Sequence, residues 1–150
     1  MNPRVSDREL NALISAAWNG LAAEEGVVER LKRHSLAYLC AYEEDELVGF
    51  VNVAWDGGIH GFILDTSVHP DYRRQGVGVK LVQQAAKVAK ERGLTWLHVD
   101  YEERLESFYG ACGFTQTKAG LINLKSDEFL GVGKGFLTEP LTTKNSSSRR

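Results

Sequence analysis

The sequence predicts an α/β fold in which a mixed, mostly antiparallel central sheet is flanked by helices. Three observations support this prediction: two amphipathic helical patterns open the chain, three strand-like runs with short polar turns follow, and a long helical pattern separates the third run from a fourth. Strands joined by short turns pair antiparallel, whereas a strand–helix–strand connection makes the two strands parallel. The 150 residues suit one domain with a sizeable core.

The first helix is expected over residues 7–18, because Leu10, Leu13 and Ile14 recur at helical spacing. Either Ser6 or Asp7 can cap it, and Gly20 ends it. A second, shorter helix is expected over residues 24–34.

Three strands are expected next. Residues 36–42 and 47–55 form a hairpin across an acidic turn, and residues 61–68 follow a second turn rich in glycine. Strict alternation along the third strand puts two sets of side chains on opposite faces: Phe62, Leu64, Thr66 and Val68 against Ile63, Asp65 and Ser67.

The long helix is expected over residues 76–92 and ends at Gly93. A strand over 95–101, a short helix over 105–111 and one or two strands within 114–124 complete the domain, which we expect to cover residues 1–130. The later residues are polar and lack a core-forming period, so residues 131–150 are predicted to be a flexible tail.

Composition narrows the function classes. A net charge of −2 gives no electrostatic reason to expect a nucleic-acid partner. No apolar run approaches the roughly 20 residues of a membrane span, and the start lacks the apolar core of a signal peptide, so a cytoplasmic protein without a membrane partner is expected. Cys40 and Cys112 fit no metal or redox spacing and the histidines are scattered, so no metal is expected.

The junction between the third strand and the long helix has the composition of an anion site. Arg73 and Arg74 precede Gly76 and Gly78, and the helix starts at once. A helix start offers unpaired N–H groups, and glycines let a phosphate approach the backbone closely. A dinucleotide-binding motif would need a third glycine where Leu81 stands, and a P-loop would need Ser or Thr there.

Two motifs in this order resemble those of the GNAT superfamily of acetyl-CoA-dependent N-acetyltransferases. The first is Arg73-x-x-Gly76-x-Gly78 between strand and helix, and the second is Phe108-Tyr109-x-x-Cys112-Gly113-Phe114. The resemblance covers residues 36–124 and implies a GNAT-like sheet in which a splayed strand pair binds acetyl-CoA as co-substrate.

The resemblance also implies which residues hold the coenzyme. The backbone of Thr66, Ser67 and Val68 would pair with the pantetheine arm, and the Val68 amide would donate to the thioester oxygen. The pyrophosphate would lie on the amides of Arg74, Gln75, Gly76, Val77 and Gly78, with Val79 completing the turn. Arg73 and Arg74 either add charge there or are simply solvated, and Lys80 and Lys87 either reach the ribose phosphate or form a solvated face.

For the chemistry, Tyr109 resembles the family's general acid, placed near the coenzyme sulfur. The base is open: Asp65 either faces the acceptor or is paired structurally, and a water chain could end on Asp65, Asp100 or Glu102. Relatives often have asparagine where this chain has Glu102 and alanine where it has Leu105, so Glu102 is a candidate for binding the acceptor.

The acceptor is expected to be a primary amine of a small molecule or peptide. Trp55 lies in an aromatic-rich region that either stacks on the acceptor or packs ordinarily, and several acids could give a mouth that attracts cations. Two alternatives stay open: a non-catalytic module that binds or senses acyl-CoA on the same fold, and transfer of a bulkier acyl group. A monomer and a homodimer are both compatible with the sequence.

Overall fold

The structure is a computed structural model that describes residues 4–20 and 23–125. The chain divides into two units, Met1–Thr117 and Lys118–Arg150, and all the helices and strands described below belong to the first. The flexible tail predicted over residues 131–150 lies outside the described residues.

The order of elements follows the sequence prediction closely from residue 7 to residue 111. The helices are α1 (Asp7–Ala17), α2 (Val27–His34), α3 (Val77–Glu91) and α4 (Glu106–Ala111), with short 3-10 turns η1 (Pro70–Tyr72) and η2 (Glu103–Leu105). The strands are β1 (Ser35–Glu43), β2 (Glu46–Trp55), β3 (His60–Val68) and β4 (Trp96–Val99). None of the helices in the described ranges is both long and apolar enough to cross a bilayer.

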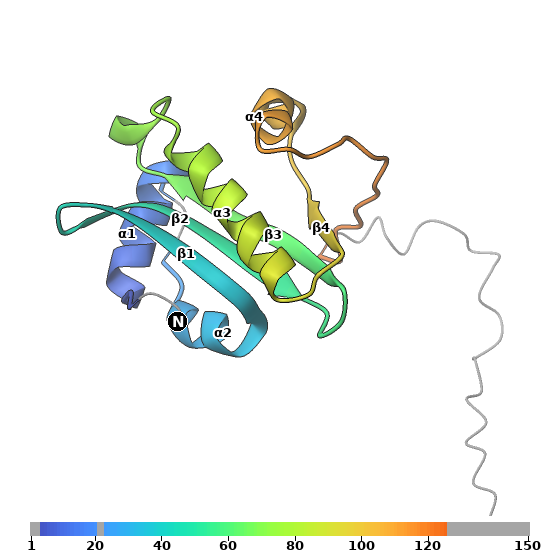
Figure 1. The fold of residues 1–150 in the computed structure, drawn as a ribbon. Coiled ribbons are helices and arrows are strands. Elements are labelled where there is room, and N and C mark those ends of the chain that lie inside the picture. The colour runs from blue at the N-terminus through green and yellow to red at the C-terminus, as the bar shows by residue number, and fades with distance from the viewer. Residues whose placement is uncertain (1–3, 21–22, 126–150) are drawn as a thin grey trace, which may run out of the picture. The chain divides into compact units, whose positions relative to one another are not determined.

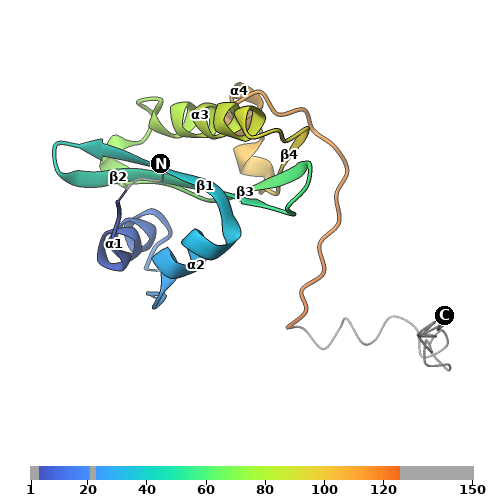
Figure 2. The ribbon, with the colours of Figure 1, turned by 60° about the horizontal axis from the view of Figure 1, so that its bottom comes forward.

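The sheet is mixed and mostly antiparallel, as predicted. Its strand order is β1-β2-β3-β4, with β1·β2 and β2·β3 antiparallel and β3·β4 parallel. Helix α3 crosses one face of the sheet (Figure 1), and α1 and α2 lie against the other face (Figure 2). The two faces carry separate apolar clusters, one centred on Val51, Val53 and Val82 and the other on Leu10, Leu31 and Phe50.

The start of α1 shows how the two N-terminal helices are held together. Ser6, rather than Asp7, caps α1, and it forms a capping box with Glu9. The Asp7 carboxylate is thereby free for the next helix, where it accepts hydrogen bonds of 2.9 Å from the amides of Gly26 and Val28. The sequence allowed either residue as the cap, and the structure gives each a different role.

Strand β3 extends beyond the end of its parallel neighbour, β4. The pairing of β3 with β4 runs only from His60↔Trp96 to Ile63↔Val99, whereas β3 continues to Val68. The backbone of residues 64–68 therefore has no β4 partner, and the two strands splay apart at this end, as the resemblance implied.

Strand β3 also contains a β-bulge, which corrects the predicted alternation. Phe50 pairs with Ser67 and Asn52 with Leu64, so two residues of β3 oppose one of β2, and Asp65 adopts a left-handed conformation with φ 58°. An extra residue reverses the facing of the side chains beyond it. Ile63 faces α3, but Ser67 contacts Trp18 at the end of α1, while Val68 packs toward α3 beside Gly78.

The strands predicted within residues 114–124 are wrong for the described part of the chain, where no strand follows β4. Leu121, Ile122 and Leu124 are exposed. A strand exists only when a neighbour satisfies its backbone groups, so an apolar run marks a possible strand without providing its partner.

Both cysteines are expected to be unreactive in the folded protein. Burial, reinforced by the charge of Glu9, raises the pKa of Cys40 to about 12, and burial also raises the pKa of Cys112. Because the thiolate is the nucleophile, a thiol reagent at about pH 8 should label neither residue in the native state and both after unfolding. Rapid labelling of the native protein would contradict the structural role predicted for these residues.

Candidate functional site

The loop between β3 and α3 is shaped by two left-handed residues. Arg74 has φ 60° and Gly76, the N-cap of α3, has φ 82°. The first hydrogen bond of the helix runs from the Lys80 amide to the Gly76 carbonyl at 3.0 Å. The amides of residues 77–79 come before it and therefore have no acceptor within the helix. The first turn of α3 contains no acidic residue. These amides and the positive end of the helix dipole together favour a bound anion.

A groove of about 710 Å³ runs from this loop to α4, and we refer to it as the groove. It brings together most of the predicted coenzyme residues. Its lining includes Thr66, Ser67, Val68, Arg73, Arg74, Gly76, Val77, Gly78, Val79 and Tyr109. Gln75 does not line it; its side-chain amide instead donates to the Asp71 carbonyl at 3.1 Å.

The two glycines of the motif are needed for different reasons. A Cβ on Gly76 would meet nothing within 4 Å, so the constraint there is the left-handed backbone. A Cβ on Gly78 would lie 3.0 Å from the Phe108 ring and 3.3 Å from the Val68 side chain. Gly78 therefore lets α3 pack closely against α4 and β3, a reason that the motif alone did not reveal.

The two arginines differ in their surroundings. Arg73 donates from Nη2 to the Ala17 carbonyl at 2.7 Å and from Nε to the Val68 carbonyl at 3.4 Å. Arg74 is exposed, and no side-chain hydrogen bond or ion pair holds it within the described residues. Arg74 is therefore the freer of the two positive charges on the groove.

Tyr109 lies where the groove meets the splayed strands. It is only 6% exposed, and its ring stacks on Tyr101 at 4.9 Å between centroids. Burial raises the pKa of the Tyr109 phenol, an effect that the nearby Thr66 hydroxyl partly offsets. The Thr66 hydroxyl is itself buried and, among the described residues, finds no hydrogen-bond partner of standard geometry. The phenol thus stays protonated at neutral pH beside a hydroxyl that can still accept a partner.

A second, smaller cavity of about 200 Å³ adjoins the groove at Thr66 and Tyr109, and we call it the side pocket. It shares four residues with the groove: Trp18, Thr66, Leu105 and Tyr109. The rest of its lining combines apolar and acidic side chains: Ile63, Leu64, Asp65, Asp100, Tyr101 and Glu102.

The three carboxylates of the side pocket have unequal partners. Asp65 accepts a long hydrogen bond of 3.5 Å from the buried Asn52 amide, and Glu102 forms an ion pair with Arg104. Asp100 has no side-chain ion pair within the described residues. Asp65 thus both faces the cavity and has a structural partner, the two alternatives that the sequence left open.

The structure does not bring Trp55 to either cavity. Trp55 pairs with Gly61, near the end of β3 remote from Thr66, and it lines neither the groove nor the side pocket. Sequence reasoning instead missed Trp18, which ends α1 and lines both cavities. No local pattern distinguished this tryptophan, because its role depends on how α1 lies against β3.

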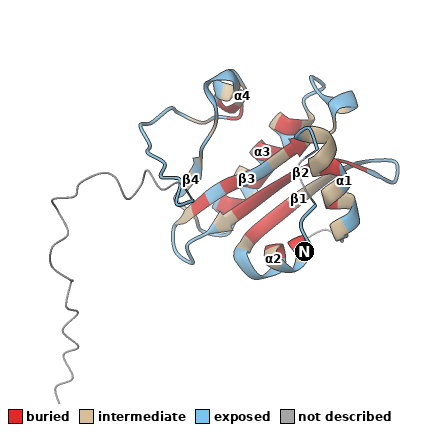
Figure 3. Ribbon diagram, turned by 180° about the vertical axis from the view of Figure 1, so that it is seen from behind, coloured by how far each residue is buried: buried red, intermediate tan, exposed pale blue. Residues whose placement is uncertain are grey.

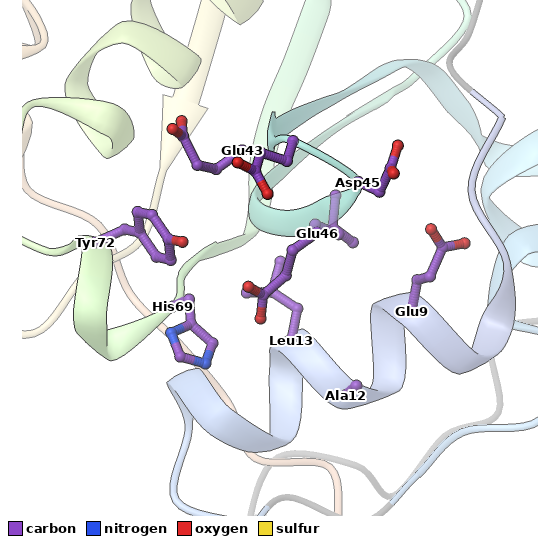
Figure 4. A pocket seen from close by; sticks show the side chains of 10 residues that line it. Glu9, Ala12, Leu13, Glu43, Asp45, Glu46, His69 and Tyr72 are labelled. Carbon is purple, nitrogen blue, oxygen red and sulfur yellow. The ribbon is translucent and has the colours of Figure 1, made fainter.

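A third cavity, of about 770 Å³, lies beside the β1–β2 hairpin (Figure 4). The carboxylates of Glu9, Glu43, Asp45 and Glu46 surround it together with His69 and Tyr72. Such a concentration of negative charge repels an anionic coenzyme, so the groove is the better candidate for that ligand.

Comparison with known protein families shows the family to which this chain belongs. The model of the acetyltransferase (GNAT) family matches residues 8–114. The chain belongs to the GNAT acetyltransferase family. GNAT proteins use acetyl-CoA as co-substrate.

Individual relatives of this GNAT chain are distant. Mycothiol acetyltransferase of Nocardia farcinica is 32% identical over 95 residues, which make up 62% of this chain and 31% of that protein. The chain spans about half the length, or less, of the curated relatives that it matches, namely 54%, 43% and 32% of three of them.

Two solved structures share the GNAT fold of this chain. One, from meticillin-resistant Staphylococcus aureus and described as a probable acetyltransferase, has a TM-score of 0.69 at 21% identity, covering 84% of this chain and 97% of that one. The other, AAC(6')-Iy in complex with the bisubstrate analogue CoA-S-monomethyl-acetylneamine, has a TM-score of 0.65 at 18% identity and covers 80% and 91% of the two chains.

Proposed function

We propose that this protein transfers the acetyl group of acetyl-CoA directly to the primary amine of a small cationic molecule or peptide side chain. One observation carries the proposal: the groove and the side pocket meet at Thr66 and Tyr109. A thioester reaching this point along the groove would lie beside an amine entering from the side pocket.

The residues of the groove fit coenzyme A. The amides of residues 77–79 and the exposed Arg74 offer donors and charge to the diphosphate. The edge of residues 64–68 that faces away from β2 has no strand partner, so it can pair with the extended pantetheine arm as it would with an added strand. In this arrangement the Val68 amide is a candidate donor to the thioester oxygen, and a pre-aimed donor of this kind contributes about 3 kcal/mol to lowering an acyl-transfer barrier.

The reaction requires two proton movements. The amine must lose a proton before its nitrogen can form a bond to the acetyl carbon, and Asp65, directly or through water, is the candidate acceptor. As the carbon–sulfur bond breaks, the sulfur gains a proton, for which the protonated Tyr109 phenol is the candidate donor. A raised pKa suits this role because the phenol keeps its proton until the thiolate forms.

The side pocket favours a cation with an apolar body. Asp65 and Asp100 supply negative charge, whereas Trp18, Leu64 and Tyr101 supply apolar and aromatic surface. Among the residues that the structure describes, no lysine or arginine lines the side pocket. An ammonium group at the carboxylates and an apolar body along the rings would satisfy both parts of the lining.

The proposal is tested by calorimetric titration with CoA and by a screen of amines in which free thiol is released from acetyl-CoA. We expect binding of CoA and turnover of 2-phenylethylamine or a related cation. Tight binding of CoA without turnover of any amine would instead favour a module that senses acyl-CoA, and absence of CoA binding would contradict the proposal altogether.

Substitution of Asp100 by Asn tests the charge of the side pocket. We expect affinity for 2-phenylethylamine in the presence of CoA to fall about 3- to 5-fold, because one exposed ionic contact is lost. Asp56→Asn is the matched control, since it makes the same charge change in the turn after β2, away from both cavities. An equal effect of the two substitutions would show that only the overall charge matters.

A further inference from the structure

Trp18 occupies a position that no motif predicted. It follows directly after α1, is 40% exposed, and is one of four residues that line both the groove and the side pocket. Of the shared residues, only Trp18 comes from the N-terminal part of the chain, since Thr66 belongs to β3 and Leu105 and Tyr109 belong to η2 and α4. An indole in this place forms part of the wall of both cavities.

A hydrogen-bonded chain fixes the indole to the bulge of β3. The Trp18 Nε1–H donates to Ser67 Oγ at 2.9 Å, and Ser67 Oγ donates to the Asp65 carbonyl at 3.0 Å. Ser67 is 2% exposed, so the hydroxyl at the centre of this hydrogen-bonded chain is shielded from water. The Trp18 indole is thereby fixed to the bulge of β3, which also places Asp65 and Thr66 at the side pocket.

A second contact fixes the helix end that carries Trp18. Helix α1 has no basic residue in its last turn, and Arg73 supplies the missing positive charge by donating to the Ala17 carbonyl at 2.7 Å. Arg73 opens the loop that leads to the anion-binding amides of α3. The position of the indole is therefore linked both to the bulge and to the loop that we propose holds the diphosphate.

We propose that Trp18 is a specificity-determining residue for the acceptor: held by Ser67 and by Arg73, its indole selects amines whose apolar body packs along it. The inference rests on the proposed function, because it assigns the acceptor to the side pocket. The carboxylates attract any ammonium group, so discrimination between amines of equal charge falls to this aromatic wall.

The test uses binding without chemistry. The protein saturated with CoA is titrated calorimetrically with 2-phenylethylamine and with ethylamine, which share the ammonium group but differ in their apolar body. Trp18→Phe keeps an aromatic ring and removes the N–H donor, Ser67→Ala removes the acceptor of that hydrogen bond, and the double variant completes a cycle. Trp55→Phe and Trp96→Phe are matched controls outside both cavities.

We expect each single substitution to weaken binding of 2-phenylethylamine roughly 3- to 10-fold, the range of one lost hydrogen bond. Ethylamine affinity and CoA affinity should change less than about twofold, and the double variant should bind no more weakly than either single one. Arg73→Gln should likewise weaken 2-phenylethylamine binding at saturating CoA, with ethylamine little affected. Thermal unfolding of each variant verifies that the fold is retained.

Other results would overturn the inference. Equal losses for both amines, additive effects in the cycle, or an equal effect of Trp55→Phe would each show that Trp18 does not select the acceptor. If CoA binds normally and these variants behave as the wild type, only the role of Trp18 fails. If the wild type binds CoA but neither amine, the acceptor site fails as well, and if it does not bind CoA the proposed function fails first.

Discussion

Replacing Tyr109 by Phe is expected to lower kcat by about 100-fold, the lower range for loss of a positioned general acid. The substitution keeps the ring that stacks on Tyr101 and removes only the hydroxyl, so packing of α4 should survive. Steady-state kinetics with a turned-over amine and calorimetry with CoA give the two readouts. CoA affinity should change little, because no hydrogen bond from the phenol to the diphosphate is invoked.

Tyr101→Phe is the matched control for this prediction. It removes the same group from the neighbouring ring of the stack, which lines the side pocket but not the groove. A comparable loss of kcat in the two variants would assign the effect to the aromatic stack, and a loss of CoA affinity alone in Tyr109→Phe would contradict the role of general acid.

The raised pKa of Tyr109 also determines how the stability of the protein and its activity should depend on pH. Burial favours the neutral phenol, so the folded protein binds this proton more strongly than the unfolded chain does. The stability that this group contributes is present below its ordinary pKa of about 10 and is lost as the pH rises through the raised value. Deprotonation of Tyr109 should therefore cause no loss of activity between neutral pH and about pH 9.

Replacing Gly76 by Ala is expected to weaken CoA binding roughly 5- to 30-fold. The new Cβ would meet no atom within 4 Å, so the penalty is confined to the left-handed backbone at φ 82° and is about 1–2 kcal/mol. If the loop relaxes to avoid this strain, residue 76 has to return to the left-handed conformation before the diphosphate can bind. Calorimetric titration with CoA measures the loss.

The same helix offers a control at its other end. Gly93, just after α3, has φ 89° and equally open space around its Cβ position. Gly93→Ala should therefore lower the free energy of unfolding by a similar amount and leave CoA affinity unchanged. Equal CoA affinities in the two variants would show that the conformation of Gly76 is not part of the coenzyme site.

Much of the fold could be predicted because it is encoded locally. The helical spacing of residues 7–18, the acidic hairpin turn and the glycines before α3 each act over a few residues, and these elements are confirmed within one or two residues of their predicted bounds. The order of elements then left few topologies for the sheet.

The parts that sequence could not supply depend on tertiary contacts. The bulge at Asp65 is invisible to an alternating pattern, yet it decides that Thr66 rather than Ser67 faces Tyr109. Trp18 reaches the site only because α1 lies against β3. Trp55 has suitable chemistry for stacking on an acceptor, but antiparallel pairing carries it toward the far end of β3, so its part in binding stays a prediction.

The pairing of β3 with β4 ends at Ile63 and Val99, and this leaves one edge of β3 without a strand partner. Unsatisfied strand edges recruit other polypeptides, and proteins usually shield them at the rim of a sheet. Here the edge of β3 that β4 leaves without a strand partner lies at residues 64–68, beside the groove that Tyr109 and Trp18 also line. Figure 3, coloured by burial, shows β2 almost entirely buried and β3 partly exposed. A slender arm such as pantetheine needs only one free strand edge to pair with, so the edge that we propose for coenzyme binding can lie within the groove.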